Sequence, residues 1–262
     1  MKWIVVIVHL IALFESKKLT IEENEQRLKE CGLTTTNKIF RGAKTTVDQA
    51  PWALIIGDSS CSGVLISPRH VLSATHCIAN MSETEWTKSK INFEFDRELC
   101  TEDENYIVTE VKASKVYVMN RNYTEIGRAK FIFLLKFCRR ITDKEAFQIQ
   151  HPDDFMIIEL AEDVEYTTNI LPINVEGTLN RMDPRLFKAR SQSMKSVACP
   201  GDSGGGAIRE NAWELYAAVG FYSEEICELT GVCNLDDENS SRKSEIFDLI
   251  ALTLIIFWFV LQ

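Results

Sequence analysis

Residues 199–206 are Cys-Pro-Gly-Asp-Ser-Gly-Gly-Gly, a stretch that suits two different roles. Three glycines after a serine are typical of a tight loop that needs positive φ angles. The same loop would also suit a nucleophile, but a serine hydroxyl is a weak one until a neighbouring base removes its proton. Ser203 can therefore act as a nucleophile only if a histidine and a carboxylate from elsewhere in the chain lie next to it.

Composition narrows the class of protein. The chain has 262 residues, of which 45% are hydrophobic, enough to bury a substantial core in one large domain or two small ones. Its formal net charge of -9 argues against a nucleic-acid partner, because phosphate binding needs clustered Lys and Arg. Neither a phosphate-binding glycine loop before a helix nor a cluster of metal ligands is evident, so we predict no cofactor and no metal.

The first 16 residues resemble an export signal. One lysine precedes an apolar run over residues 3–14, a length that fits the core of a secretory signal better than a membrane span. We expect a signal peptide over 1–16 with cleavage near Ser16; a buried strand or short helix is the alternative. The protein would then be secreted.

Cysteines and sequons agree with export. The chain has eight cysteines, which we expect to be mostly disulfide-bonded in a secreted protein. Three Asn-x-Ser/Thr tripeptides mark candidate glycosylation sites, at Asn80, Asn122 and Asn239.

Residues 17–38 form a polar leader that is expected to be a short helix or disordered. The sequence after it is rich in patterns that predict strands. Residues 51–77 alternate short β-branched runs with turn residues, and residues 154–160 resemble a buried strand. Residues 212–222 follow the serine loop and are expected to pair with it as a hairpin. Short strands without a long helical pattern predict an all-β barrel or sandwich.

His76 is the candidate base. It adjoins Cys77 at the end of the expected strand 71–74, and a bond from Cys77 to Cys61 would join a strand to a turn and fix the direction of the imidazole. The alternative is a histidine that is merely a satisfied polar residue.

Asp154 is the candidate carboxylate. It precedes an apolar strand, where a buried carboxylate could accept from the second ring nitrogen of a histidine and fix its tautomer. Asp153 is the alternative by position, and a solvated turn after Pro152 is equally compatible with the local sequence.

Three motifs together resemble the chymotrypsin/trypsin-like serine proteases. They are SATHC at 73–77, DDFMIIEL at 153–160 and GDSGG at 201–205, in the order histidine, aspartate, serine. The resemblance implies an all-β, two-barrel fold and a serine endopeptidase that hydrolyses polypeptide substrates. Ser203 would attack the peptide carbonyl, His76 would transfer the proton and Asp154 would orient His76.

The resemblance also implies a zymogen and an oxyanion hole. Lys38 precedes Ile39, so an activating protease that cuts there would free an amine to pair with Asp202. The backbone N–H groups of Gly201 and Ser203 would donate to the oxyanion.

Several residues depart from the family pattern. Val197 stands where the trypsin branch carries an aspartate, so an apolar specificity pocket is expected. Phe221 and Tyr222 replace residues of the substrate strand, and the bulk of Tyr222 would narrow that pocket. Cys199 lacks its usual partner, and Cys227 is the nearest candidate.

The domain itself, residues 39–233, is expected to be shortened. Only 49 positions separate Asp154 from Ser203, too few for a full second barrel, so we predict that this barrel is incomplete. A catalytically inactive homologue that acts as a binding or regulatory protein is therefore the alternative function.

Residues 234–262 change character to a polar linker followed by an apolar tail. Small residues near Asn239, a brief polar spacer and an apolar end fit a lipid-anchor signal, which would attach the protein to the outer membrane surface. A buried helix or a divergent end is the alternative.

Overall fold

The computed structural model describes residues 17–30, 50–57, 61–80, 88–142, 154–172, 187–188, 215–216 and 222–233. Within them, six antiparallel strands close into a barrel: β1 Ala53–Ile56, β2 Cys61–Leu65, β3 His70–Ser73, β7 Met156–Leu160, β6 Glu125–Leu134 and β5 Tyr117–Met119, which pairs with β1 again. A further strand, β4 Tyr106–Val108, pairs with the end of β6. The predicted all-β, trypsin-like fold class is confirmed for this barrel.

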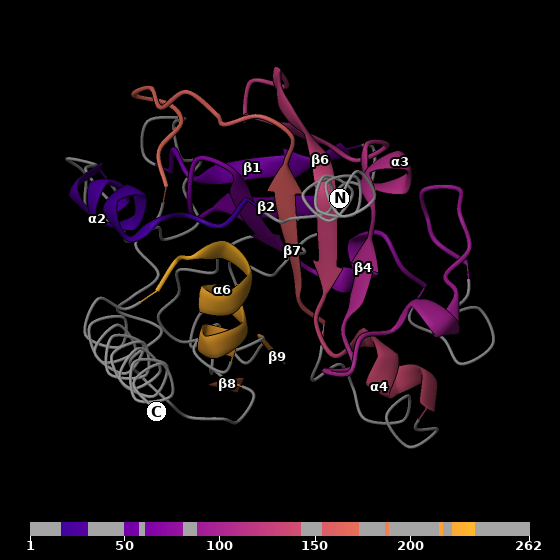
Figure 1. The fold of residues 1–262 in the computed structure, drawn as a ribbon. Coiled ribbons are helices and arrows are strands. Elements are labelled where there is room, and N and C mark those ends of the chain that lie inside the picture. Colours follow the sequence, from indigo (N-terminus) through magenta and orange to yellow (C-terminus); the bar gives the residue numbers. More distant parts are fainter. Residues whose placement is uncertain are drawn as a thin grey trace, which may run out of the picture.

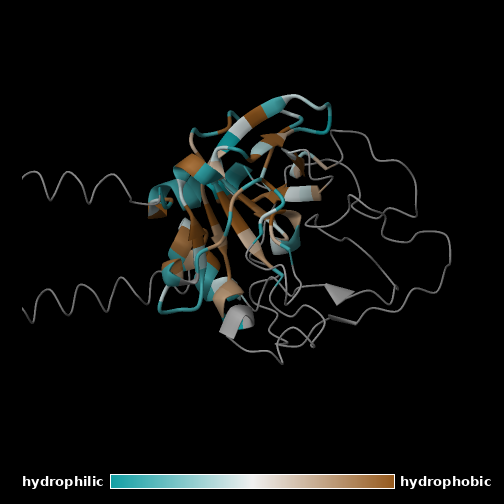
Figure 2. Ribbon diagram, turned by 90° about the vertical axis from the view of Figure 1, so that its right-hand side faces the viewer, coloured by the Kyte–Doolittle hydropathy of each residue, from teal (hydrophilic) through white to brown (hydrophobic). Residues whose placement is uncertain are grey.

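The barrel forms because its strands carry β-branched and aliphatic residues that it can bury. β1 alternates partly exposed and buried residues, as a strand does when one face looks inward. β7 is buried at every position because other parts of the protein cover its outer face. Figure 2 shows the hydrophobic residues gathered on the central strands, with hydrophilic residues on the outer loops and helices.

Gly63 marks how tightly the barrel interior is packed. A Cβ at this position would lie 2.7 Å from Ile56 Cδ1 and 2.8 Å from a methyl carbon of Val71. Glycine therefore lets β1 and β3 bring their side chains together over β2.

An aromatic group of core residues packs beside β4 and the end of β6. Phe95 makes an edge contact with Tyr106 at 5.1 Å and a tilted contact with Phe137 at 4.9 Å. A disulfide between Cys100 and Cys138 closes the same region. The short elements around it are η4 Arg97–Leu99, α3 Glu110–Ala113 and α4 Phe137–Thr142. The apolar run at 131–138 thus ends β6 and begins α4.

Two helices flank the barrel, α2 Ile21–Glu30 and α6 Ser223–Thr230. Figure 1 shows α6 beside β7 and α2 near the end of β1. The leader segment 17–38 thus contains a helix in its described part. None of the described helices is both long and apolar enough to cross a membrane.

One expectation for the later part of the chain was wrong, because Cys227 pairs with Cys233 and so is not the partner of Cys199. Within 212–222, the described strand β9 Leu215–Tyr216 pairs with β8 Phe187–Lys188, which precedes the serine loop in the chain. The serine loop itself lies outside the described residues, so its pairing with 212–222 stays a prediction.

Candidate active site

The register of β3 and β7 brings the predicted histidine and aspartate to the same end of the barrel. Ser73, the last residue of β3, lies opposite Met156, the first residue of β7. In an antiparallel pair, the residues that follow one strand meet the residues that precede the other. His76 lies in a 3₁₀ turn, η3 Thr75–Cys77, and Asp154 is two residues before β7, so the two side chains converge.

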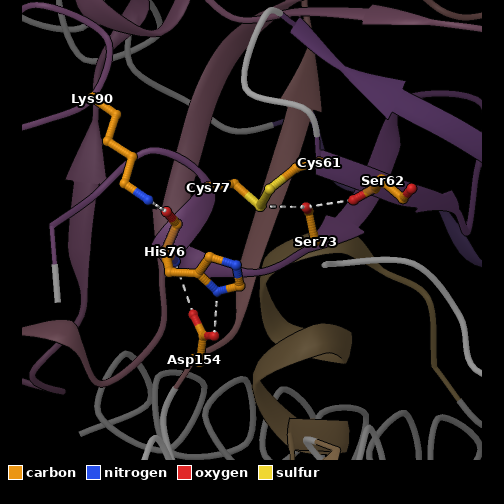
Figure 3. Close-up of a disulfide and its surroundings, with 7 residues drawn as sticks. All are labelled: Cys61, Ser62, Ser73, His76, Cys77, Lys90 and Asp154. Atoms are coloured by element: carbon orange, nitrogen blue, oxygen red, sulfur yellow. Dashed lines mark hydrogen bonds and ion pairs between the residues drawn. A yellow bond between two sulfur atoms is a disulfide. The ribbon is translucent and has the colours of Figure 1, made fainter. Parts of the chain in front are cut away.

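Asp154 holds His76 through two hydrogen bonds (Figure 3). The backbone N–H of His76 donates to Oδ1 over 2.8 Å, and the imidazole Nδ1 lies 2.6 Å from Oδ2. The side chain of Asp154 is 18% exposed and that of His76 is 33% exposed. One carboxylate therefore fixes both the main chain and the ring of the histidine.

This contact determines the tautomer of His76. An ionised carboxylate is only an acceptor, so Nδ1 carries a proton and donates it to Asp154. Nε2 then has a lone pair, and Figure 3 shows this second ring nitrogen on the side of the ring away from Asp154. The imidazole can therefore accept a proton at Nε2 while Asp154 stabilises the resulting cation.

A disulfide supports the turn that carries His76. Cys77 is bonded to Cys61 at the start of β2, with their Cα atoms 6.0 Å apart. Ser73 donates its hydroxyl to the carbonyl of Ser62 over 2.8 Å and lies 3.8 Å from Cys77 Sγ. The bridge links η3 to the neighbouring strand and restricts the ring's movement.

The same cysteines do not make a metal centre. The ligand atoms of Cys61, His76 and Cys77 lie within 4.8 Å of one another. Both sulfurs are bonded in the disulfide, whereas metal binding at cysteine needs thiolates.

Further contacts at this site had no clear signal in the sequence. Thr75 donates its hydroxyl to the carbonyl of Phe155 over 2.9 Å, and Lys90 Nζ donates to the carbonyl of His76 over 2.6 Å. The ring of Phe155 stacks on Tyr222, with centroids 4.6 Å apart. Lys90 lies 14 positions from His76, and the other two pairs are much farther apart in the chain, so helix or strand periodicity could not link them.

Tyr222 was predicted to narrow a specificity pocket. The structure places it at the N-terminus of α6, where it is 1% exposed and lies against Phe155. Its ring thus packs on the residue that follows Asp154 in the chain.

The other predicted site residues lie outside the described residues. They are Ser203, Gly201, Asp202, Ile39, Val197, Phe221 and Asn239. Asp153, the alternative to Asp154, lies outside the described residues too. The tail at 234–262 and the proposed signal peptide lie outside as well.

Two of the three candidate glycosylation sites are described. Asn122 is exposed in the turn between β5 and β6. The side-chain amide of Asn80 donates to the carbonyl of Lys88 over 3.0 Å. Glycosylation stays a prediction for all three positions.

Curated relatives are serine proteases of insects. The chain is 24% identical over 238 residues to the CLIP domain-containing serine protease HP8 of Bombyx mori, covering 74% of this chain and 64% of that protein. It is 26% identical over 164 residues to the serine protease ea of Drosophila melanogaster, covering 55% of this chain and 36% of that protein. The chain thus spans less than two thirds of the length of these relatives. A shorter match, to the CLIP domain-containing serine protease B10 of Anopheles gambiae, is 40% identical over 60 residues, or 20% of this chain and 17% of that protein.

The family match covers the barrel and the histidine–aspartate pair. The pattern of the nematode trypsin-6-like family matches residues 1–178, which include His76 and Asp154 and end before the serine loop. This match extends over more than half of the chain and agrees with the closed barrel and the serine-protease-like arrangement at its end. The chain is therefore a divergent, trypsin-like member of the nematode trypsin-6-like family.

Proposed function

We propose that this protein is a serine endopeptidase that hydrolyses peptide bonds through His76, Asp154 and Ser203. The observation that carries the proposal is the pair of hydrogen bonds from His76 to Asp154, which leaves Nε2 as the basic atom of the ring. The GDSGG loop supplies a serine of the type that such a base activates.

The proposed reaction follows from these groups. Nε2 of His76 takes the hydroxyl proton of Ser203 as Oγ bonds to the substrate carbonyl carbon. The backbone N–H groups of Gly201 and Ser203 stabilise the oxyanion, each worth about 3 kcal/mol. His76 then gives its proton to the leaving amine, and a water molecule, deprotonated by the same nitrogen, releases the acyl group from Ser203.

Activation by cleavage after Lys38 belongs to the same proposal. The new amine of Ile39 would pair with Asp202 and order the oxyanion loop. Val197 would give the pocket an apolar floor, so we expect cleavage after apolar residues. Three disulfides among the described residues support secretion, because such bonds persist in oxidising compartments.

One observation favours a second function, an inactive homologue that binds a partner. The family match ends at residue 178, so the part of the chain that it supports contains the histidine and the aspartate without the serine loop. A protein selected only for binding would keep the barrel without turnover.

Active-site labelling separates the two functions. Residues 34–37 are replaced by aspartate (T34D, T35D, T36D, N37D), so that enteropeptidase cuts after Lys38 and leaves Ile39 native. The cut protein is then treated with a fluorophosphonate probe, which reacts with activated serines. We expect labelling that increases after the cut and is absent in Ser203→Ala and His76→Ala. An unlabelled cut protein that remains folded by circular dichroism would establish the inactive homologue.

A further inference from the structure

Residues 17–30, here called the strap, are built into the barrel. The carboxylate of Glu159 in β7 is fully buried, and its Oε1 accepts the backbone N–H of Lys17 over 3.0 Å. Lys130 on β6 lies 3.9 Å from the same oxygen. Because a buried carboxylate needs donors to offset its lost hydration, Glu159 depends on the strap for one of them.

The strap also joins the barrel to α6. The backbone N–H of Leu19 donates to the carbonyl of Thr230 over 2.8 Å, and the Leu19 side chain belongs to the hydrophobic core. Gly231 ends α6 in the left-handed region, with φ of 70°. A Cβ on Gly231 would lie 2.3 Å from the carbonyl oxygen of Leu19, so this contact requires glycine.

A capping box starts the helix of the strap. Thr20 Oγ1 accepts the backbone N–H of Glu23 over 3.2 Å, and Glu23 accepts that of Thr20 over 2.8 Å. Glu23 also binds Arg69, between β2 and β3, over 2.8 Å, and the same guanidinium contacts Asp163 at 2.6 Å. The backbone hydrogen bond from Thr20, together with Arg69, lowers the pKa of Glu23 below its usual value.

Polar side chains of α2 are buried against the end of α6. Asn24 is fully buried, and its amide donates to the carbonyl of Cys233 over 3.0 Å. Arg27 is 1% exposed and donates to Asn24 Oδ1 from Nε and Nη2, over 2.9 Å and 2.8 Å. Buried polar groups of this kind fix one docking position, because any other would leave them without partners.

We infer that the contacts of the strap are sufficient to hold it on the barrel after the backbone is cut at Lys38, with no need of a covalent link. All the contacts above are made by residues 17–27, which precede the cut. None of these contacts depends on the peptide bond between residues 38 and 39. The surface that receives the strap is formed by Arg69, Glu159 and residues 230–233. This state arises naturally only if the zymogen is activated by that cut, so the inference rests on the proposed function.

The test uses the full chain with the enteropeptidase site, Cys31→Ser and Ser203→Ala. The first substitution removes any disulfide to the strap, and the second makes the outcome independent of catalysis. After complete cleavage, size-exclusion chromatography and intact mass spectrometry are applied to the main peak. We expect one peptide ending at Lys38 per barrel in native buffer and its release in denaturant. A peptide that elutes separately in native buffer overturns the inference and leaves the proposed protease function unaffected.

Two variants locate the binding surface. Gly231→Ala is expected to reduce the retained peptide at least tenfold because its Cβ displaces Leu19. Gly57→Ala is the matched control: Gly57 also has a positive φ, 48°, but its Cβ would meet only an atom 3.7 Å away, so retention should be unchanged. If Gly231→Ala does not fold, Asn24→Ala gives the same test from the strap side. Full retention in both Gly231→Ala and Asn24→Ala would overturn the assigned surface.

Discussion

Tyr222 lies flat on Phe155, with ring centroids 4.6 Å apart and planes inclined by only 6°. Phe155 follows Asp154 directly in the chain, and its carbonyl accepts the hydroxyl of Thr75, the residue before His76. The residue that caps the N-terminus of α6 is thus stacked on the segment that presents the histidine–aspartate pair. A helix outside the barrel thereby supports the geometry of the site.

We predict that Tyr222→Ala lowers kcat of the activated enzyme by about 10-fold to 100-fold, because small displacements of catalytic groups have effects of this size. Tyr222→Phe should keep the stack and most of the activity. Both variants are assayed on a chromogenic peptide ester across pH. A positioning role moves kcat and its pH profile while KM stays near the wild-type value. An Ala variant with unchanged kcat and pH profile would contradict this role.

Asp154→Asn should reduce kcat/KM by about 10⁴-fold. The amide can donate to Nδ1 of His76, which favours the tautomer with its proton on Nε2, and that nitrogen then cannot act as a base. Asp153→Asn is the matched control and should change kcat/KM only a few-fold. The imidazole nitrogen shifts in NMR spectra report the tautomer directly. A larger effect at Asp153 than at Asp154 would show that Asp153, and not Asp154, orients His76.

The histidine and aspartate were identifiable from sequence because each follows or precedes a short apolar strand. β3 and β7 bury every residue, and their sequences are largely apolar, with His70 and Ser73 in β3 and Glu159 in β7 as the polar exceptions. Their pairing places Ser73 opposite Met156, and the motifs beside them then meet.

The role of the strap could not be predicted in the same way. Its contacts join residues that are very far apart, such as Lys17 with Glu159 and Asn24 with Cys233. Its sequence is polar because its buried groups are hydrogen-bonded side chains, and such a segment resembles a solvated leader. The one local signal was the Thr-x-x-Glu capping box at 20–23, which indicates a helix start but not what the helix contacts.

Removing the disulfide next to His76 should affect both stability and catalysis. With its cysteines 16 positions apart in the sequence, the Cys61–Cys77 bond stabilises the fold by about 3 kcal/mol in the chain-entropy account. The double variant Cys61→Ser, Cys77→Ser should lose this stability, and kcat should fall because η3 is released.

The matched control is Cys227→Ser, Cys233→Ser. Its cysteines are six positions apart in the sequence, and the bond contributes about 2 kcal/mol in the same account. Urea unfolding measures both stabilities, and kcat is compared at a temperature where both variants remain folded. Equal effects of the two double variants on kcat would show that the Cys61–Cys77 bond has no special part in holding His76.

His70 should make the fold sensitive to acid. Its side chain is fully buried, and Nδ1 lies 2.8 Å from Ser67 Oγ, which already accepts the backbone N–H groups of Arg69 and His70. The serine hydroxyl must therefore donate to Nδ1, so the imidazole is neutral. Burial, with a smaller contribution from the nearby Arg69 charge, lowers the pKa of His70 from 6.5 to about 3.

The sign of the effect follows from this depressed pKa. Between pH 6.5 and about 3 the unfolded chain binds a proton at His70 that the folded protein does not, so stability falls as the pH is lowered through that range. The expected loss from this residue between pH 7 and pH 4 is about 3 kcal/mol. His70→Gln keeps an acceptor for Ser67 but does not titrate, so its free energy of unfolding should fall by about 3 kcal/mol less than that of wild type over the same interval. Urea unfolding at the two pH values measures the difference, and equal losses in both proteins would refute the assignment.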